Sequence, residues 1–198
     1  MRAQKTSTDE RQVQILDAAL ELIDEVGVDR LSMRSIAARV TLSPMALYRH
    51  FGSREELLDA LVGRVLSGAT VGDPCSGWAE QLRALGRSLL SVAIAHPASF
   101  NLVLTRPYRA PEAIQVMQAT EHLLQQAGIP ADDRPRVERF VSTALIGFAA
   151  AVANGAFWSD GRPEGAPMNP EEEAWADELE LNITDLAVVI EANSVTAT

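Results

Sequence analysis

Residues 41–51, TLSPMALYRHF, gather side chains that suit contact with DNA, and no carboxylate lies among them. If the stretch is helical, Leu47 and Phe51 lie four residues apart on one face and can anchor it to neighbouring helices. The residues left outward or sideways are Met45, Ala46, Tyr48, Arg49 and His50. Arginine can fork onto guanine, methionine and alanine can meet thymine methyl groups, and tyrosine and histidine can donate to phosphate. The pattern favours a helix that reads the major groove of DNA.

The charge distribution fits such a contact, although the chain as a whole is acidic. The formal net charge is −10, but no acidic residue lies between Asp29 and Glu55. That window contains the basic residues Arg30, Arg34, Arg39, Arg49, His50 and Arg54, whereas most of the excess negative charge lies in 67–198. A local positive patch is what phosphate contact requires. A solvated arginine-rich face is the alternative, and charge by itself does not separate the two.

Helical periodicity predicts the elements that must position these residues. The predicted helices are 9–26, 33–40, a short helix from Pro44 and a fourth helix that begins at Ser53. Ser32 and Ser43 are favoured N-caps of the second and third helices, and Ser53 with Glu56 forms a capping-box pattern. Two short helices joined by the turn 41–43 are typical of a helix-turn-helix motif.

Two stretches of the chain, ILDAALELIDEVGVDRLSMRSIAARV and LSPMALYRHFGSREELLDALV, carry a resemblance to a known family. Residues 9–66 resemble the DNA-binding domain of the TetR family of bacterial transcriptional regulators, and LYRHF-x-S-R-E-E-L is the most specific block. The resemblance implies an all-α homodimer in which each subunit inserts its third helix into half of a palindromic operator. It also implies a C-terminal domain that dimerises and binds a small molecule, whose binding releases the DNA. The implied function is a transcriptional regulator, most often a repressor.

The same resemblance assigns DNA contacts to individual residues of this chain. It implies phosphate contacts from Ser32 and Arg34 of the second helix. It implies base contacts from Ser43, Met45 and Ala46, phosphate contacts from Tyr48 and His50, and Arg54 in the place of a common lysine. Arg49 faces either a base or a phosphate.

Thr41 departs from the family pattern, because many members have glycine at this turn. A threonine costs more than a glycine there if the turn requires a positive φ. We therefore expect either a slightly different turn or an added hydroxyl group that faces the DNA.

Residues 67–77, SGATVGDPCSG, are rich in glycine and small residues and predict a junction between domains 1–66 and 67–198. Beyond the junction the periodicity predicts helices at about 78–95, 97–105, 110–127, 134–158 and 171–191. The segment 159–170 is expected to be a loop, since it contains three prolines. The predicted fold class is all-α.

Two stripes of the C-terminal domain are candidates for a dimer interface. The first is Gly147, Ala151 and Gly155, and the second is Trp175, Leu179, Ile183, Leu186 and Ile190. The resemblance implies that the last two long helices pair with their copies as a four-helix bundle. A palindrome also needs two reading helices about 34–36 Å apart, which favours a dimer. The alternative is that both stripes pack within one subunit.

The small-molecule site is expected among the helices that start near 78, 97, 110 and 134. Its candidate residues are Trp78, Phe100, Leu104, Met117, His122, Phe148 and Trp158. Each of them also fits an ordinary hydrophobic core, since large apolar residues at helical spacing usually belong to one.

Other classes of function find no support in the sequence. There is no glycine-rich phosphate loop after a strand, no nucleophile elbow and no metal-ligand spacing, so neither an enzyme nor a cofactor or metal is predicted. A helical interaction protein that had lost DNA binding would carry acidic residues or deletions in the third helix. The predicted third helix of this chain has neither. The apolar stretch 140–158 predicts a buried helix rather than a membrane span. The polar N-terminus has no apolar signal core, and we expect the protein in the cytoplasm.

Overall fold

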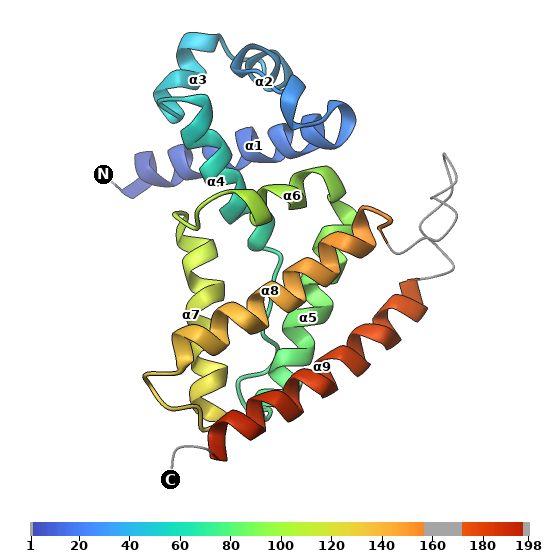
Figure 1. Cartoon of the computed structure of the whole chain (residues 1–198). Helices are drawn as coiled ribbons and strands as arrows, with labels where there is room; N and C mark the ends of the chain where they lie inside the picture. Colours follow the sequence, from blue (N-terminus) through green and yellow to red (C-terminus); the bar gives the residue numbers. More distant parts are fainter. Residues whose placement is uncertain (1, 157–171, 196–198) are drawn as a thin grey trace. The chain divides into compact units, whose positions relative to one another are not determined.

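The computed structural model describes residues 2–156 and 172–195, and over these residues it consists of helices and their connections without a β-strand (Figure 1). The elements are α1 (Arg2–Val26), the 3-10 helix η1 (Val28–Arg30), α2 (Met33–Arg39), α3 (Pro44–His50), α4 (Arg54–Leu66), α5 (Trp78–Ala95), α6 (Pro97–Thr105), α7 (Pro111–Gln126), α8 (Arg134–Ala153) and α9 (Glu172–Val195). The predicted all-α class is therefore confirmed.

Packing divides the chain into two compact units, which do not coincide with the predicted domains. The N-terminal unit comprises Met1–Ser67 and His96–Ala113, and the C-terminal unit comprises Gly68–Ala95 and Ile114–Thr198. Helix α6 belongs to the N-terminal unit because it packs on α1 and α4. The division into functional domains 1–66 and 67–198 stays a prediction.

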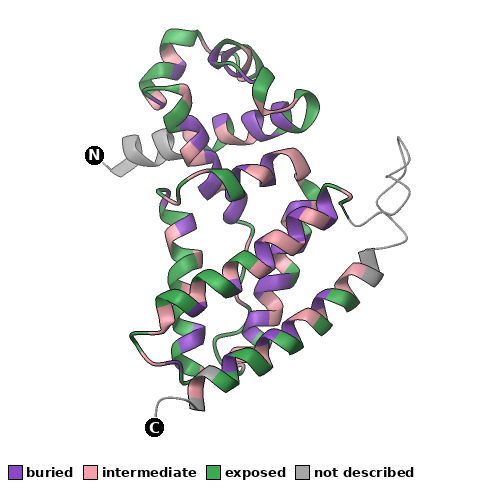
Figure 2. Ribbon diagram, viewed as in Figure 1, coloured by how far each residue is buried: buried purple, intermediate pink, exposed green. Residues whose placement is uncertain are grey.

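The N-terminal unit is held by a hydrophobic core that α1 to α4 and α6 share. Its fully buried side chains include Ile15, Ile23, Ile36, Leu47, Leu57, Leu61 and Phe100. Figure 2 shows buried and exposed residues alternating along the helices of this unit. Burying a side chain of this size stabilises the fold by about 1.5–3 kcal/mol. The core therefore fixes which face of each short helix is left for solvent.

Three serines begin the helices as the sequence predicts. The side chains of Ser32, Ser43 and Ser53 each accept a hydrogen bond from the backbone N–H three residues later, and Pro44 occupies the first position of α3. The predicted capping box at Ser53 is only half formed, because the carboxylate of Glu56 accepts from the N–H of Gly52 at 2.9 Å. The complete capping box lies at α2, between Ser32 and Ser35.

The C-terminal unit is organised around α5, which packs against α8 and α9. Gly86 makes the close approach possible, because a Cβ at this position would lie 2.7 Å from Cδ1 of Ile183 and 3.4 Å from Cδ2 of Leu145. Both of these side chains are buried in the interface between the three helices. The apolar stripe of α9 is therefore covered from within its own subunit.

Several helix ends differ from the predicted ones. Helix α1 begins at Arg2 instead of residue 9, and α9 continues to Val195 instead of ending at 191. Helix α8 ends at Ala153, where the prediction ran to 158, and the turn that follows places Gly155 at a φ of 69°. The predicted loop 159–170 lies outside the described residues. Within the described part, no helix combines the length and hydropathy needed to cross a bilayer.

Candidate nucleic-acid interface

Helix α3 presents the predicted exposed face and buries the predicted anchors. Leu47 is 0% exposed and Phe51 is 4% exposed, whereas Met45 is 72% exposed and Tyr48 is 48% exposed. Arg49 is also exposed, so the two predicted anchors are buried and Met45, Tyr48 and Arg49 face outward. The helix is only two turns long, so burial of Leu47 in its middle and of Phe51 at its end fixes its orientation. Its outward side chains are left for a partner.

The remaining candidates on α2 and α3 are either partly buried or already hydrogen-bonded within the protein. Ala46 and His50 are half-buried, and the carbonyl oxygen of His50 accepts a hydrogen bond from the Gln12 side chain of α1 at 3.2 Å. The hydroxyl oxygens of Ser32 and Ser43 both serve as helix caps, since they accept from backbone N–H groups at 3.0 and 3.1 Å. A DNA contact from Ser43 has to use its hydroxyl proton. The hydroxyl of Ser32 already donates to Oγ of Ser35 at 3.0 Å, so a phosphate has to displace that bond.

Three arginines of the N-terminal unit have no hydrogen bond or ion pair from their guanidinium groups to another described residue. They are Arg30, Arg34 and Arg49, and all three are exposed. In contrast, the guanidinium groups of Arg11, Arg39, Arg54, Arg64, Arg106 and Arg109 bond to carboxylates or carbonyl oxygens of the same unit. An unpaired guanidinium keeps its charge available to a phosphate, because no neighbouring anion competes for it. Among the described side chains of this unit, the available positive charge therefore lies on η1, α2 and α3.

Arg39 shows how the paired arginines are neutralised. Its Nη2 lies 2.6 Å from Oε2 of Glu25, and its Nη1 lies 3.4 Å from Oε2 of Glu21. The hydrogen bond from Arg39 lowers the pKa of the Glu25 carboxyl, and the same bond raises the pKa of Arg39. Arg39 thus stays an internal partner of α1 and is not among the candidate contacts.

Arg54 has a structural role that sequence reasoning missed. Its Nη2 donates to the carbonyl oxygen of Val28 at 2.7 Å, and its Nε donates to the carbonyl oxygen of Leu31 at 3.1 Å. The guanidinium also lies 3.5 Å from the carboxylate of Glu55. Arg54 therefore fixes η1 to the start of α4, and a phosphate contact from it, which stays a prediction, has to compete with these bonds.

Thr41 adopts the backbone conformation in which a glycine was expected. Its φ is 55°, and it is the one non-glycine residue with a positive φ in the described part of the chain. The N–H of Leu42 donates to the carbonyl oxygen of Ala37 at 2.8 Å, and the N–H of Thr41 donates to that of Ala38 at 3.3 Å. These two bonds form the Schellman motif that ends α2, with Thr41 at the position where glycine is usual. The turn therefore has the conformation in which glycine is usual, and the β-branched side chain bears the strain.

Helix α6 and Arg106, which follows it, are bonded to α1 and α4. The carboxylate of Asp24 on α1 accepts from the backbone N–H and the hydroxyl of Ser99 at 3.3 and 3.1 Å, and it lies 2.7 Å from Nδ1 of His96. At the other end, Nε of Arg106 donates to Asp59 of α4 at 2.8 Å. Burial by itself lowers the pKa of Arg106, but its hydrogen bonds to Asp59 and Glu55 outweigh this effect and raise the pKa.

The predicted ligand residues are divided between the two units. Phe100 is buried in the core of the N-terminal unit, and Leu104 on the same helix is 51% exposed. Trp78, Met117, His122 and Phe148 belong to the C-terminal unit, and Trp158 lies outside the described residues. Only Phe148 of this set lines a described groove, where its ring also meets that of Trp175 edge to face with centroids 6.5 Å apart.

The predicted dimer stripe of α9 is largely covered within the subunit. Leu179, Ile183, Leu186 and Ile190 are all buried, as the alternative interpretation of the sequence allowed. The apolar side chains that α8 and α9 leave exposed are Phe140, Leu181, Val188 and Val189. Phe140 and Val189 line a groove of about 440 Å³ together with Gly147, where an added Cβ would meet nothing within 4 Å. Of the other candidates, Ala151 and Gly155 are half-buried, and so is Trp175.

Comparison with known protein families gives two matches that together span most of the chain. Residues 15–61 match the model described as bacterial regulatory proteins, tetR family. Residues 72–182 match the model described as tetracyclin repressor-like, C-terminal domain.

Two curated relatives are regulators by name. The chain is 32% identical over 165 residues to the class A tetracycline repressor protein from transposon 1721 of Escherichia coli, a match that covers 79% of this chain and 74% of that protein. It is 32% identical over 119 residues to the HTH-type transcriptional repressor DrrR1 of Streptomyces coeruleorubidus. That second match covers 58% of this chain, and it spans less than half of the relative, 43% of its length.

A solved structure shares the fold over nearly the whole chain. Apo ActR from Streptomyces coelicolor aligns with a TM-score of 0.76 and 27% identity, and the alignment covers 94% of this chain and 97% of that one. ActR in complex with actinorhodin aligns with a TM-score of 0.72 and 26% identity, over 92% of this chain and 97% of that one.

Proposed function

Since this chain belongs to the TetR family of bacterial regulatory proteins, we propose that it is a sequence-specific DNA-binding repressor, released from its operator by a small molecule. The observation that carries the proposal is the exposed face of α3. Met45, Tyr48 and Arg49 are exposed on a helix that the buried side chains of Leu47 and Phe51 anchor to the core. A short helix fixed in this way can place base-reading side chains in the major groove.

The proposed DNA contacts divide into two kinds. Met45, Ala46 and Arg49 are assigned to the bases, where a thymine methyl suits the first two and a guanine suits the guanidinium. Arg34, Tyr48 and His50 are assigned to phosphates, together with the hydroxyl of Ser32. The hydroxyl proton of Ser43 is assigned to a base. The unpaired charge of Arg34 supports its phosphate contact, since each phosphate contact from a cation releases counterions and contributes a salt-dependent affinity.

We propose that the repressor acts in the cytoplasm as a homodimer on a palindromic operator. The exposed apolar side chains Phe140, Leu181, Val188 and Val189 favour α8 and α9 as the interface, since Phe140 and Val189 line one groove and exposed apolar surface marks association sites. A second copy related by two-fold symmetry would cover the same groove on both subunits. The buried stripe of α9 then supports the interface from beneath.

The effector is proposed to be a small organic molecule that binds one state of the dimer better than the other. ActR, which has the same fold, was solved in complex with actinorhodin. A ligand shifts the equilibrium between DNA-competent and DNA-incompetent states only by its difference in affinity for the two. Such a ligand lowers operator affinity without any contact to the DNA.

Selection of binding sites from random DNA tests the proposal. The full chain at modest salt is expected to enrich a palindrome whose half-sites lie about one helical turn apart. Met45→Ala is expected to change the preferred base at one position of each half-site. Tyr48→Phe is expected to weaken binding to all sequences alike. Recovery of no common sequence, or of a site without two-fold symmetry, contradicts the proposal.

A further inference from the structure

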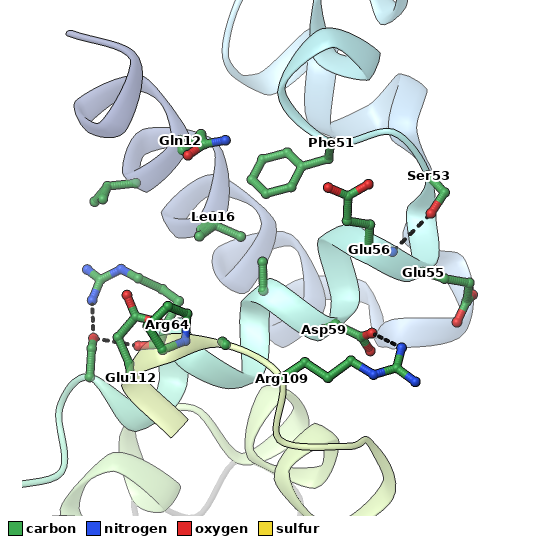
Figure 3. A pocket seen from close by; sticks show the side chains of 15 residues that line it. Gln12, Leu16, Phe51, Ser53, Glu55, Glu56, Asp59, Arg64, Arg109 and Glu112 are labelled. Atoms are coloured by element: carbon green, nitrogen blue, oxygen red, sulfur yellow. Dashed lines mark hydrogen bonds and ion pairs between the residues drawn. The ribbon is translucent and has the colours of Figure 1, made fainter. Parts of the chain in front are cut away.

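A groove of about 910 Å³ lies in the N-terminal unit between α1, α4 and residues 109–112 (Figure 3). Its apolar wall includes Val13 and Leu16 of α1, with Phe51 and Ala60. The volume is that of a site for a drug-sized organic molecule. None of the ligand residues predicted from the sequence lines it, because the sequence pattern does not bring residues 109–112 next to α1.

Residues 109–112 form one wall because Gly63 lets them approach α4 closely. A Cβ at Gly63 would lie 2.4 Å from the Cβ of Ala110 and 2.6 Å from the carboxylate of Glu112. Arg109 of the same segment donates to Oδ2 of Asp59 at 3.1 Å, which ties the segment to α4 a second time. The wall is thus fixed by packing on one side and by an ion pair on the other.

The charges on the groove walls do not cancel. Glu55 and Asp59 are paired with Arg106, Asp59 is also paired with Arg109, and Arg64 is paired with Asp17. Glu56 accepts a hydrogen bond from Gly52 but has no cationic partner, and Glu112 has no hydrogen-bond or cationic partner among the described residues. Two carboxylates therefore face an apolar groove without a counter-ion from the described part of the protein.

We propose that this groove binds an organic cation. Its apolar body lies against Val13, Leu16, Phe51 and Ala60, and its positive charge is held by the unneutralised carboxylate of Glu112, while Glu56 adds negative potential at the other end of the groove. A neutral molecule of the same shape gains the apolar contacts but leaves the carboxylates unpaired. An anion of the same shape is repelled. The site therefore selects by charge.

Occupation of the groove has a consequence for the reading helix. The groove is built on Phe51, which is one of the two anchors of α3, and on Gln12, which holds the carbonyl oxygen of His50. A ligand here contacts the base of α3 directly. A change in operator affinity follows only if the chain is a DNA-binding regulator, so this consequence rests on the proposed function, whereas binding of the cation does not.

Calorimetric titration of the full chain without DNA tests the site. The probes are diphenylpropylamine, diphenylpropanol and diphenylpropionate, which share one apolar body and differ in charge. The amine is expected to bind most tightly, the alcohol less tightly and the carboxylate least. Glu112→Gln is expected to weaken binding of the amine about two- to fivefold and to leave binding of the alcohol unchanged. Glu178→Gln, at another exposed position on α9 and outside the groove, is the matched control and is expected to change neither.

A second variant places the ligand in the groove itself. Ala60→Leu fills the apolar wall from α4 and is expected to abolish binding of both the amine and the alcohol. The proposal is overturned if the amine binds no better than the alcohol, if Glu112→Gln keeps the full preference, or if a folded Ala60→Leu protein binds as before. Because no DNA is present, a failure here is distinct from a failure to select an operator.

Discussion

Arg54 donates from Nη2 to the carbonyl oxygen of Val28 at 2.7 Å, and this bond joins the start of α4 to the turn that precedes α2. A lysine at this position keeps the charge but cannot form the forked pair of bonds. Arg54→Lys is therefore expected to lower the free energy of unfolding by about 1 kcal/mol, measured by denaturant titration.

The salt dependence of operator binding then separates the two roles of Arg54. If Arg54 is structural, Arg54→Gln leaves the slope of log affinity against log salt unchanged. A decrease of the slope by about one unit in Arg54→Gln, with normal stability in Arg54→Lys, shows instead that Arg54 contacts a phosphate.

Thr41→Gly is expected to stabilise the protein. The threonine has a φ of 55°, which a glycine adopts without the Cβ clash, so relief of strain is worth about 1 kcal/mol in the free energy of unfolding. Thr143→Gly is the matched control, since Thr143 lies exposed within α8 and its replacement is expected to destabilise by a few tenths of a kcal/mol. A Thr41→Gly protein that unfolds at lower denaturant than the wild type would falsify the strain argument. Weaker operator binding by a more stable Thr41→Gly protein assigns the hydroxyl to the DNA.

Arg34 and Arg39 lie on the same short helix and are expected to respond differently to the same change. Arg34 has no partner among the described residues, whereas Arg39 is bonded to Glu21 and Glu25. Arg34→Gln is expected to reduce the salt slope of operator binding by about one unit, and Arg39→Gln is expected to leave it unchanged. Filter binding at several salt concentrations measures both, and equal slopes for the two variants contradict the assignment.

The Glu25 carboxyl is expected to titrate below its ordinary pKa, because the hydrogen bond from Arg39 favours the charged form. The folded-state pKa is the lower one, so the stabilisation is present above the unfolded-state pKa and is lost as the pH falls through the folded-state pKa. Side-chain carbon NMR of Glu25 across the acidic range measures the effect. In Arg39→Gln the pKa of Glu25 is expected to return towards its ordinary value, and an identical titration in both proteins rules out Arg39 as the cause.

Val189 and Val26 are each 42% exposed, and only Val189 lines the groove of α8 and α9. Val189→Glu places a charge in the proposed interface and is expected to raise the dimer dissociation constant at least tenfold, because a buried unpaired charge costs several kcal/mol. Val26→Glu is expected to leave the dimer intact. Sedimentation equilibrium measures the two masses. If the Val189→Glu protein is still a dimer, the interface does not include this groove. If the wild type is a monomer, the proposed homodimer is wrong.

The parts of α3 that depend on local pattern could be predicted from the sequence. Leu47 and Phe51 are one helical turn apart, and Ser43 with Pro44 marks the helix start, so the buried and exposed faces follow from neighbours in the chain. Thr41 was less predictable. The sequence allowed a slightly different turn, whereas the structure has the positive φ at which glycine is usual, with the threonine in place.

The parts that depend on distant neighbours could not be predicted. The acceptors of Arg54 are carbonyl oxygens of Val28 and Leu31, which become available only once η1 has formed. Periodicity likewise places Ile183 on the apolar face of its helix, but it does not say which residue packs against it. That residue is Gly86 on α5, far earlier in the chain. A row of apolar residues fixes a face of a helix, and only the folded structure supplies the neighbour.

The discontinuity of the N-terminal unit limits how such proteins can be recombined. Its chain leaves at Ser67, returns at His96 and leaves again at Ala113, and the returning segment is bound by Asp24 at one end and by Asp59 at the other. A single crossover near residue 67 therefore separates α6 from both carboxylates that hold it. An exchange of DNA specificity between two relatives preserves these contacts only if α6 is carried along with the first four helices. The N-terminal unit thus has to be transferred as two segments of chain. A hybrid made with a single crossover is expected to be less stable than either parent.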